Sequence, residues 1–230
     1  MIKYKINPEL KSKFQDAINK TKENGEEHGF YICEDNKGLS SSELKFGKDR
    51  RINLGDPVIS CHGKKVQGNF HTHSYLTLFK QKSRFMKPGM SDEDVKKFIK
   101  DRHSEHIKES KTNGITIDSP SPKDLLTSIL YNCIGKSEGI MCVGSDMGND
   151  KVECWIPKEI PREDCDRAYH ALYDDSDIHN RQQHAVQSAN KHNRQQHAAQ
   201  NAVKEKETIP YQSWMTSLFN KEIIDLKKRA

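Results

Sequence analysis

The sequence Gly68-Asn69-Phe70-His71-Thr72-His73-Ser74 decides how the rest of the chain is interpreted. Residues i and i+2 of an extended strand point to the same side, so His71 and His73 would present two imidazoles to one point. Zinc favours nitrogen ligands, and a catalytic zinc site adds a third protein ligand and keeps one position for water. The chain has 11 histidines, so one His-x-His pair carries weight only with a third ligand from elsewhere.

Two other segments supply side chains that suit such a site. Upstream, Glu26 and Glu27 come directly before an apolar segment that we expect to be a strand. Downstream, Ser121 and Asp124 form a Ser-x-x-Asp pattern at the start of the apolar segment 125–134. This segment predicts a helix that packs on a sheet, and a carboxylate at the start of a core helix is held rigidly.

The order of a glutamate, His-x-His and Ser-x-x-Asp, over roughly residues 8–157, resembles the JAMM motif of MPN-type zinc metalloproteases. The family's glutamate usually stands three residues before a glycine, here Gly29, which favours Glu26 over Glu27 as the counterpart. The resemblance implies Glu26 as general base, Ser121 as the group that stabilises the oxyanion, and three zinc ligands, His71, His73 and Asp124.

A second Ser-x-x-Asp pattern, from Ser91 to Asp94, lies nearer to His73 in the sequence. It starts a mostly charged segment, which we expect to be a surface helix capped by Ser91. We prefer Asp124 because its helix is strongly apolar. With Asp124 as ligand, residues of about 75–118 form an insertion between two parts of one site. Long connections of this kind often carry function, so we expect a flap that sets substrate choice.

The resemblance implies an α/β fold of the MPN type, a layered arrangement like that of cytidine deaminases, with a curved mixed β-sheet flanked by helices. The residues themselves predict a first helix that begins at Pro8 behind the cap Asn7. Apolar and β-branched runs predict further elements. The expected strands are 28–34, 57–61, 66–73, 139–144 and 151–156, and the expected helices begin at 91 and 124.

The last part of the chain changes in character after Pro157 and Pro161. We therefore expect a metalloprotease-like domain over residues 1–160 and an extension over 161–230. The extension contains a His/Gln-rich repeat, 179–185 and 192–198, which we interpret as a polar connector. After it, apolar residues at helical spacing predict an amphipathic helix that packs on the core or on a partner protein. These residues are Trp214, Met215, Leu218, Phe219, Ile223 and Leu226.

Composition and cysteine usage bear on location and partners. Charged residues make up 31% of the chain and the net charge is +5, but Lys and Arg are dispersed among acids, so a nucleic-acid partner is not demanded. No apolar run approaches the length of a membrane span and no signal peptide is visible. None of the six cysteines forms a C-x-x-C pair. We expect reduced cysteines and a cytoplasmic protein.

The function implied by the resemblance is zinc-dependent hydrolysis of a peptide or isopeptide bond. In this family the bond is often that between a lysine and ubiquitin or a ubiquitin-like protein, so the expected partner is a protein or peptide substrate. Two other functions stay open: a non-catalytic MPN-type scaffold for partner proteins, and a nucleic-acid-associated factor that uses the basic part of the insertion. All ligand positions are filled, which favours the enzyme.

Overall fold

The computed structural model describes residues 6–47, 52–82, 89–107, 118–148, 150–173 and 212–227. Its strands are β1 (His28–Asp35), β2 (Gly38–Ser41), β3 (Lys45–Phe46), β4 (Lys65–His73), β5 (Ile140–Ser145), β6 (Lys151–Pro157) and β7 (Phe219–Asp225). Its helices are α1 (Pro8–Asn24), α2 (Pro57–Ser60), α3 (Leu76–Lys82), α4 (Asp92–Ile107), α5 (Pro122–Cys133) and α7 (Ser213–Ser217), and residues 162–173 are also helical.

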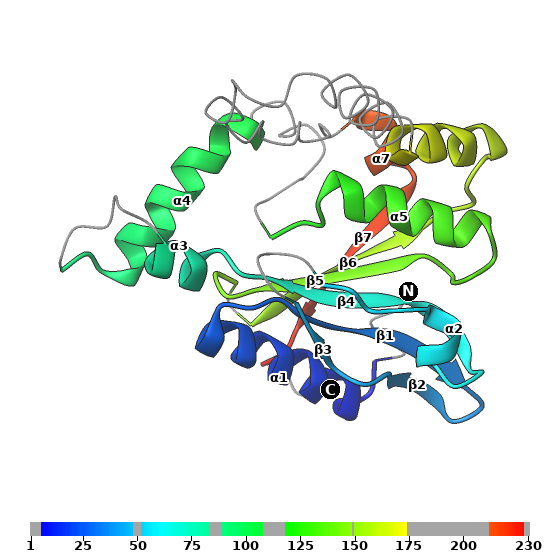
Figure 1. Cartoon of the computed structure of the whole chain (residues 1–230), viewed down its shortest axis with the longest axis horizontal. Helices are drawn as coiled ribbons and strands as arrows, with labels where there is room; N and C mark the ends of the chain where they lie inside the picture. The colour runs from blue at the N-terminus through cyan, green and yellow to red at the C-terminus, as the bar shows by residue number, and fades with distance from the viewer. Residues whose placement is uncertain are drawn as a thin grey trace, which may run out of the picture.

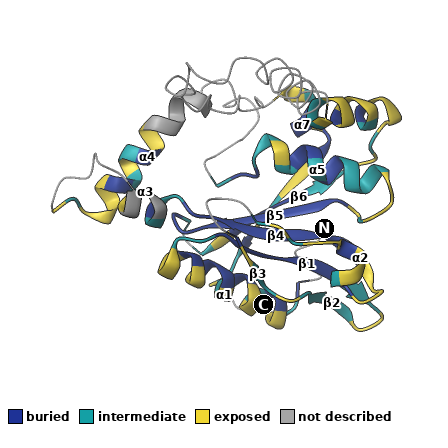
Figure 2. Ribbon diagram, viewed as in Figure 1, coloured by how far each residue is buried: buried dark blue, intermediate teal, exposed yellow. Residues whose placement is uncertain are grey.

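The seven strands form one open sheet in the order β2-β1-β4-β5-β6-β7, with β3 paired to β1. The pair β4–β5 is parallel and every other pair is antiparallel. The α/β class expected from the sequence is therefore confirmed as a mixed sheet with helices. The central strands β4 and β5 are buried along almost their whole length (Figure 2), as strands covered on both faces should be.

Helices cover both faces of the sheet (Figure 1). On one face α1 packs its apolar stripe, including Leu10, Phe14 and Ile18, against strand residues such as Phe30 and Phe70. The other face is covered by α5, the helix 162–173 and α7, whose cluster includes Leu125, Leu126, Ile129, Met141, Val143, Ala168 and Met215. Side chains alternate along β4, so Phe70 faces α1 while its neighbour His71 faces the α5 side.

The core under α1 is built on three fully buried phenylalanines. The ring centroids of Phe14 lie 5.7 Å from Phe30 and 4.6 Å from Phe70, and the two strand rings are 5.1 Å apart. Burial of each ring contributes about 1.5–3 kcal/mol. The predicted start of α1 is confirmed: the Asn7 side chain accepts a hydrogen bond from the Leu10 amide, and Pro8 is the first helical residue. This cluster fixes α1 under β1 and β4.

Two predicted elements are wrong. Residues 57–60 form helix α2, not a strand, because Asp56 caps the amides of Val58 and Ile59 and Pro57 occupies the first helical position. The segment predicted as a long amphipathic helix forms only the short α7 and then strand β7, which pairs with β6 from Phe219 to Asp225. The open edge of β6 offers backbone partners that a helix would not use, so tertiary pairing overrides helical spacing.

Because β7 belongs to the same sheet as β1 to β6, residues 212–227 are an integral part of this fold and not a helical extension. The His/Gln-rich repeat expected to be a connector lies outside the described residues.

The expectation of reduced cysteines is also contradicted. The six cysteines form three disulfides, Cys33–Cys61, Cys133–Cys165 and Cys142–Cys154. They tie β1 to the end of α2, α5 to the helix 162–173, and β5 to β6. Disulfides of this kind are typical of oxidising compartments, so the cysteine argument for a cytoplasmic location no longer holds.

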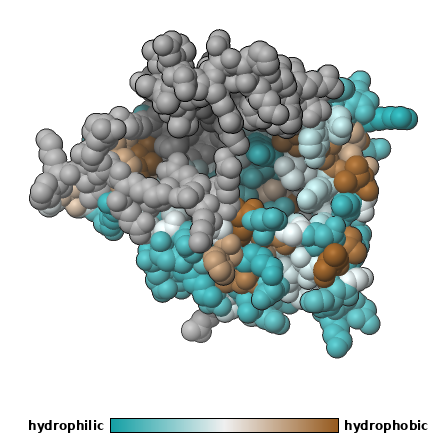
Figure 3. All heavy atoms as spheres, viewed as in Figure 1, coloured by the Kyte–Doolittle hydropathy of each residue, from teal (hydrophilic) through white to brown (hydrophobic). Residues whose placement is uncertain are grey.

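The surface carries the charged residues that the composition predicts. In Figure 3, hydrophilic residues separate small hydrophobic patches over the part of this face that the structure describes. Large apolar side chains that are exposed in the described part of the chain include Phe46, Val58, Ile59 and Ile134. Among the described helices, none has both the length and the apolar character that a membrane span requires.

Asp150, in the turn between β5 and β6, connects three elements through its carboxylate. It accepts hydrogen bonds from Lys22 at 3.0 Å and Gln15 at 3.2 Å on α1, and it pairs with Lys227 beyond β7 at 2.9 Å. The bond from Lys227 contributes most to a pKa lowered to about 2; partial burial opposes this shift, and Lys22 and Gln15 add to it. The Asp150 carboxylate therefore links helix α1 to the segment that follows β7 through charged hydrogen bonds.

We expect Asp150→Asn to lower the free energy of unfolding at pH 7 by about 1–2 kcal/mol, after allowance for the exposed lysines. Asn is chosen because residue 150 has a φ of 54°, which Asn also tolerates. A depressed native pKa stabilises above the unfolded pKa, so this contribution should be present above about pH 4 and should disappear as the pH falls towards 2. Urea denaturation at several pH values measures it.

The control is Asp16→Asn, which alters an exposed acid on α1 and should change stability by less than about 0.5 kcal/mol. Equal losses in the two variants would contradict the role given to Asp150.

Candidate metal centre

The two histidines of β4 lie at the carboxyl end of the strand, on the face that α5 covers. His71 pairs with Gly29 of β1 and with Val143 of β5, and His73 pairs with Ser145. Both histidine residues are buried, with 5% and 7% of their surface exposed. Buried imidazoles need polar partners, so their environment decides what they do.

Helix α5 brings Asp124 to the same point. Ser121 caps the helix by accepting a hydrogen bond from the Asp124 amide, and the Asp124 carboxylate accepts in return from the Ser121 amide and hydroxyl, at 2.9 and 2.7 Å. This is a capping box, with Pro122 at the first helical position. Leu125, Leu126 and Ile129 then bury the helix against the sheet. The carboxylate is therefore held by its own helix start.

The three side chains converge as the sequence predicts. The Nε2 atoms of His71 and His73 are 3.1 Å apart, and Oδ2 of Asp124 lies 3.4 Å from the first and 3.8 Å from the second. Ligand atoms held at about 2.0–2.1 Å by a tetrahedral zinc lie about 3.3–3.4 Å from one another. The residues therefore fit a single metal ion of this size, and among the described residues no other group of three His, Cys, Asp or Glu side chains has its ligand atoms within 4.8 Å of one another.

The charges of these residues interact strongly. Burial alone would raise the pKa of Asp124, but the adjacent His71 and His73 outweigh it and hold the pKa well below its usual range. Burial alone would lower the pKa of His71, but the Asp124 carboxylate beside it raises it above the usual value. Asp124 is therefore an ionised oxygen donor, the form in which a carboxylate binds metal.

The structure separates the two candidate glutamates, Glu26 and Glu27. Gly29 lies opposite His71, and Glu27 stands two residues before it, directly ahead of β1, where continued alternation would put its side chain on the histidine face. Glu27 is only 8% exposed, and its charge adds to the effect of Asp124 on the pKa of His71. Glu26 is half-buried and bonded to Asn24, with its carboxylate accepting from the Asn24 amide group at 3.3 Å. Of the two glutamates, Glu27 is thus the one that interacts with a histidine of the cluster, although the family spacing ranked it second.

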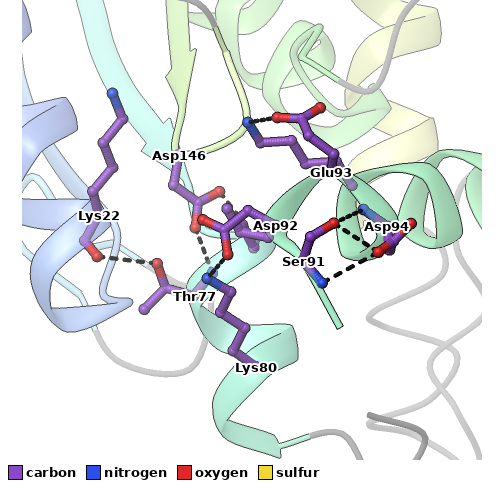
Figure 4. Close-up of polar contacts among 10 residues, drawn as sticks. Lys22, Thr77, Lys80, Ser91, Asp92, Glu93, Asp94 and Asp146 are labelled. Atoms are coloured by element: carbon purple, nitrogen blue, oxygen red, sulfur yellow. Dashed lines mark hydrogen bonds and ion pairs between the residues drawn. The ribbon is translucent and has the colours of Figure 1, made fainter. Parts of the chain in front are cut away.

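The rival Ser-x-x-Asp pattern forms a local cap on the surface. Figure 4 shows Ser91 and Asp94 bonded to each other at the start of α4, next to an ion pair between Lys80 and Asp92. Asp94 is exposed, and it is not in the group that contains the two histidines. The same sequence pattern therefore makes a helix cap in both places, and only the α5 copy lies over the histidines.

Two contacts around the centre were not anticipated. The hydroxyl of Tyr75 lies 3.1 Å from Nδ1 of His73, and the two rings meet edge to face with centroids 5.4 Å apart. Tyr75 lies beyond the end of β4, in the bend before α3, so strand alternation does not predict this contact.

The second contact is a buried polar network beside α5. Glu153 of β6 lies on the histidine face, since both it and His71 pair with Val143. Its Oε1 accepts from the Ser119 hydroxyl and from the Trp155 indole, each at 2.6 Å, and Oε2 pairs with Lys221 at 2.7 Å. Ser119 is two residues before the cap of α5, so the network holds the entry to the helix that carries Asp124.

Comparison with protein-family models, with curated proteins and with solved structures finds no match to this chain. The function must therefore be inferred from the residues of the chain and their geometry.

We expect Ser119→Ala to lower the free energy of unfolding by about 1–3 kcal/mol, because it takes a hydrogen bond from a buried, charged acceptor. The matched control is Ser217→Ala, which removes an exposed hydroxyl bonded to the Trp214 carbonyl and should cost less than about 0.5 kcal/mol. Chemical denaturation of both variants measures the difference. A Ser119 variant as stable as the control would show that the network does not hold this segment.

Proposed function

We propose that this chain is a zinc-dependent hydrolase of the JAMM type that cleaves a peptide or isopeptide bond. The observation that carries the proposal is the convergence of Nε2 of His71, Nε2 of His73 and Oδ2 of Asp124, which lie 3.1 to 3.8 Å apart, close to the spacing of tetrahedral ligands. Three protein ligands leave the fourth position open, which is the arrangement of catalytic zinc sites.

The resemblance to the JAMM motif supports the assignment from a second direction. The motif requires a glutamate before the first strand, a His-x-His pair and a Ser-x-x-Asp helix start. In this fold, β4 carries the pair, β1 beside it follows the glutamates, and α5 over the same face starts at the serine. A mixed sheet covered by helices on both faces is compatible with the MPN-like layered fold, which we propose on this basis.

When bound, zinc supplies a Lewis acid for the scissile carbonyl and lowers the pKa of its water towards neutrality. Under this proposal Glu27 accepts the proton of the attacking water and returns it to the leaving amine. Its burial and its effect on the pKa of His71 support this role. Glu26 is instead bonded to Asn24 through its carboxylate and its backbone amide. We therefore assign the base to Glu27, a change from the residue that family spacing favours.

In this structure the Ser121 hydroxyl already donates a hydrogen bond to the Asp124 carboxylate. That bond supports a role in holding the ligand carboxylate. Donation to the oxyanion, as the resemblance implies, requires the hydroxyl to turn from Asp124 to the substrate oxygen during the reaction. The substrate class, a protein or peptide that includes conjugates of ubiquitin or a ubiquitin-like protein, follows from the resemblance alone.

We expect the purified protein to bind one zinc ion per chain and Asp124→Ala to weaken binding by more than about 100-fold, since loss of a direct ligand should exceed the effect of an outer partner. Asp94→Ala is the matched control, because it removes an aspartate from the same Ser-x-x-Asp pattern on α4, and its zinc affinity should equal that of the wild type. Elemental analysis and competition with a chromophoric chelator measure both. Loss of zinc from the Asp94 variant alone would move the site to α4.

We expect Glu27→Gln to keep zinc and to lower the rate of cleavage by about 10²–10⁴-fold, because the amide cannot accept a proton. Glu26→Gln is the control and should cleave like the wild type. Lysine-linked diubiquitin and a panel of fluorogenic peptides serve as substrates. A large loss in the Glu26 variant alone would return the base to that residue, and a wild type that binds zinc but cleaves none of them would favour the scaffold function.

A further inference from the structure

Tyr75 contacts a proposed zinc ligand on the side away from the metal. Its hydroxyl oxygen lies 3.1 Å from Nδ1 of His73, while Nε2 of the same ring faces His71 and Asp124. A neutral imidazole has one proton, and the nitrogen without it is the one that can bind metal. If Nδ1 donates its proton to Tyr75, the Nε2 lone pair is free and points into the ligand cluster.

We propose that Tyr75 is a positioning residue for zinc, which fixes the tautomer and the ring orientation of His73 by accepting a hydrogen bond from Nδ1. This inference rests on the proposed zinc site. Partners on the second nitrogen of ligating histidines orient the ring and raise its basicity, and their removal typically costs about 10- to 100-fold in metal affinity. The edge-to-face contact of the two rings restricts the orientation further.

Asp146 holds Tyr75 in place. It follows β5 directly, is only 4% exposed, and accepts hydrogen bonds from the amides of Tyr75, Leu76 and Thr77 at 2.9, 3.1 and 2.8 Å. The bond to Thr77 is visible in Figure 4, where the Thr77 hydroxyl also donates to the Lys22 carbonyl. The turn that follows His73 is thus fixed at consecutive amides, and the tyrosine ring is carried on this fixed turn.

Tyr75 also belongs to the small core of the insertion. Its ring packs against a cluster formed by Leu76 of α3, Val95 and Ile99 of α4, and Met147 after β5. The expected insertion of about 75–118 is therefore attached to the metal centre through its first residue, although residues 83–88 and 108–117 lie outside the described part. Through Tyr75 the insertion therefore contributes to the metal site itself, in addition to the role in substrate choice that we expect from its position.

The test is the zinc affinity of Tyr75→Phe, measured with zinc alone by chelator competition. The substitution keeps the ring and removes only the hydroxyl, so we expect affinity to fall by about 10- to 100-fold. The matched control is Tyr31→Phe, since the hydroxyl of Tyr31 also makes a part-buried contact and donates to the Gly55 carbonyl at 2.8 Å. Removal of that structural bond should lower the melting temperature and leave zinc affinity unchanged.

A spectroscopic readout separates positioning from general stability. In the zinc-loaded wild type, histidine-selective ¹⁵N NMR should show a slowly exchanging Nδ1 proton on His73. In Tyr75→Phe this proton should exchange faster. Asp146→Asn, which keeps the hydroxyl but weakens the turn, should lower zinc affinity less than Tyr75→Phe does.

The outcomes distinguish this inference from the proposed function. Zinc affinity and His73 proton exchange that are unchanged in Tyr75→Phe would overturn the role of Tyr75 while the zinc site stands. A wild type that binds no zinc would overturn the zinc site and this inference together. An equal loss of affinity in Tyr31→Phe would show that loss of a tyrosine hydroxyl far from the histidines has the same effect, and would also overturn it.

Discussion

The parallel pairing of β4 with β5 is the constraint on which the rest of the structure depends. Parallel neighbours cannot be joined by a tight turn, so the chain must leave the end of β4, cross one face of the sheet and return to the start of β5. Helix α5 is the last part of that crossover, and its first turn carries Asp124. The pairing itself requires Gly68, because a Cβ there would lie 1.9 Å from the Ile140 carbonyl oxygen. The contact that brings the strands together thus also brings a carboxylate over the histidines.

The carboxyl ends of these two strands gather the polar groups of the site. His73 and Ser145 pair there, Asp146 follows Ser145 directly, and Tyr75 is two residues beyond His73. In open α/β sheets, ligands bind outside the carboxyl ends of parallel strands, where loops can bring in side chains without breaking the sheet. The rest of the histidine face is filled by the apolar residues under α5. Polar chemistry is therefore concentrated at one end of a face that is otherwise a packed core.

The charged groups of the His71, His73 and Asp124 cluster are stable in the protein interior only if each has a partner. An ionised carboxylate beside two imidazoles is costly to bury unless each group is paired, and here Asp124 is satisfied by the cap of its own helix and by the histidines. The Glu153 network beside α5 follows the same rule, with both carboxylate oxygens occupied. These arrangements reduce the motion of α5 relative to the sheet, which a metal site with narrow distance tolerances requires.

The sequence by itself determined the elements whose signals are local. Alternation put His71 and His73 on one side of a strand, the Asn7-Pro8 start defined α1, and the Ser121 cap with its apolar run defined α5. The convergence of His71, His73 and Asp124 was predicted correctly because a family pattern supplied the distant partner. Only the tertiary structure shows that Glu27 is buried and acts on the charge of His71 while Glu26 bonds to Asn24, because two adjacent glutamates have almost the same local sequence. It also decided the C-terminal strand, since β7 exists through the open edge of β6, and the cysteine pairs, since disulfides join residues that are distant in the sequence. These features depend on which distant segments meet in space, and the spacing of residues within one segment does not contain that information.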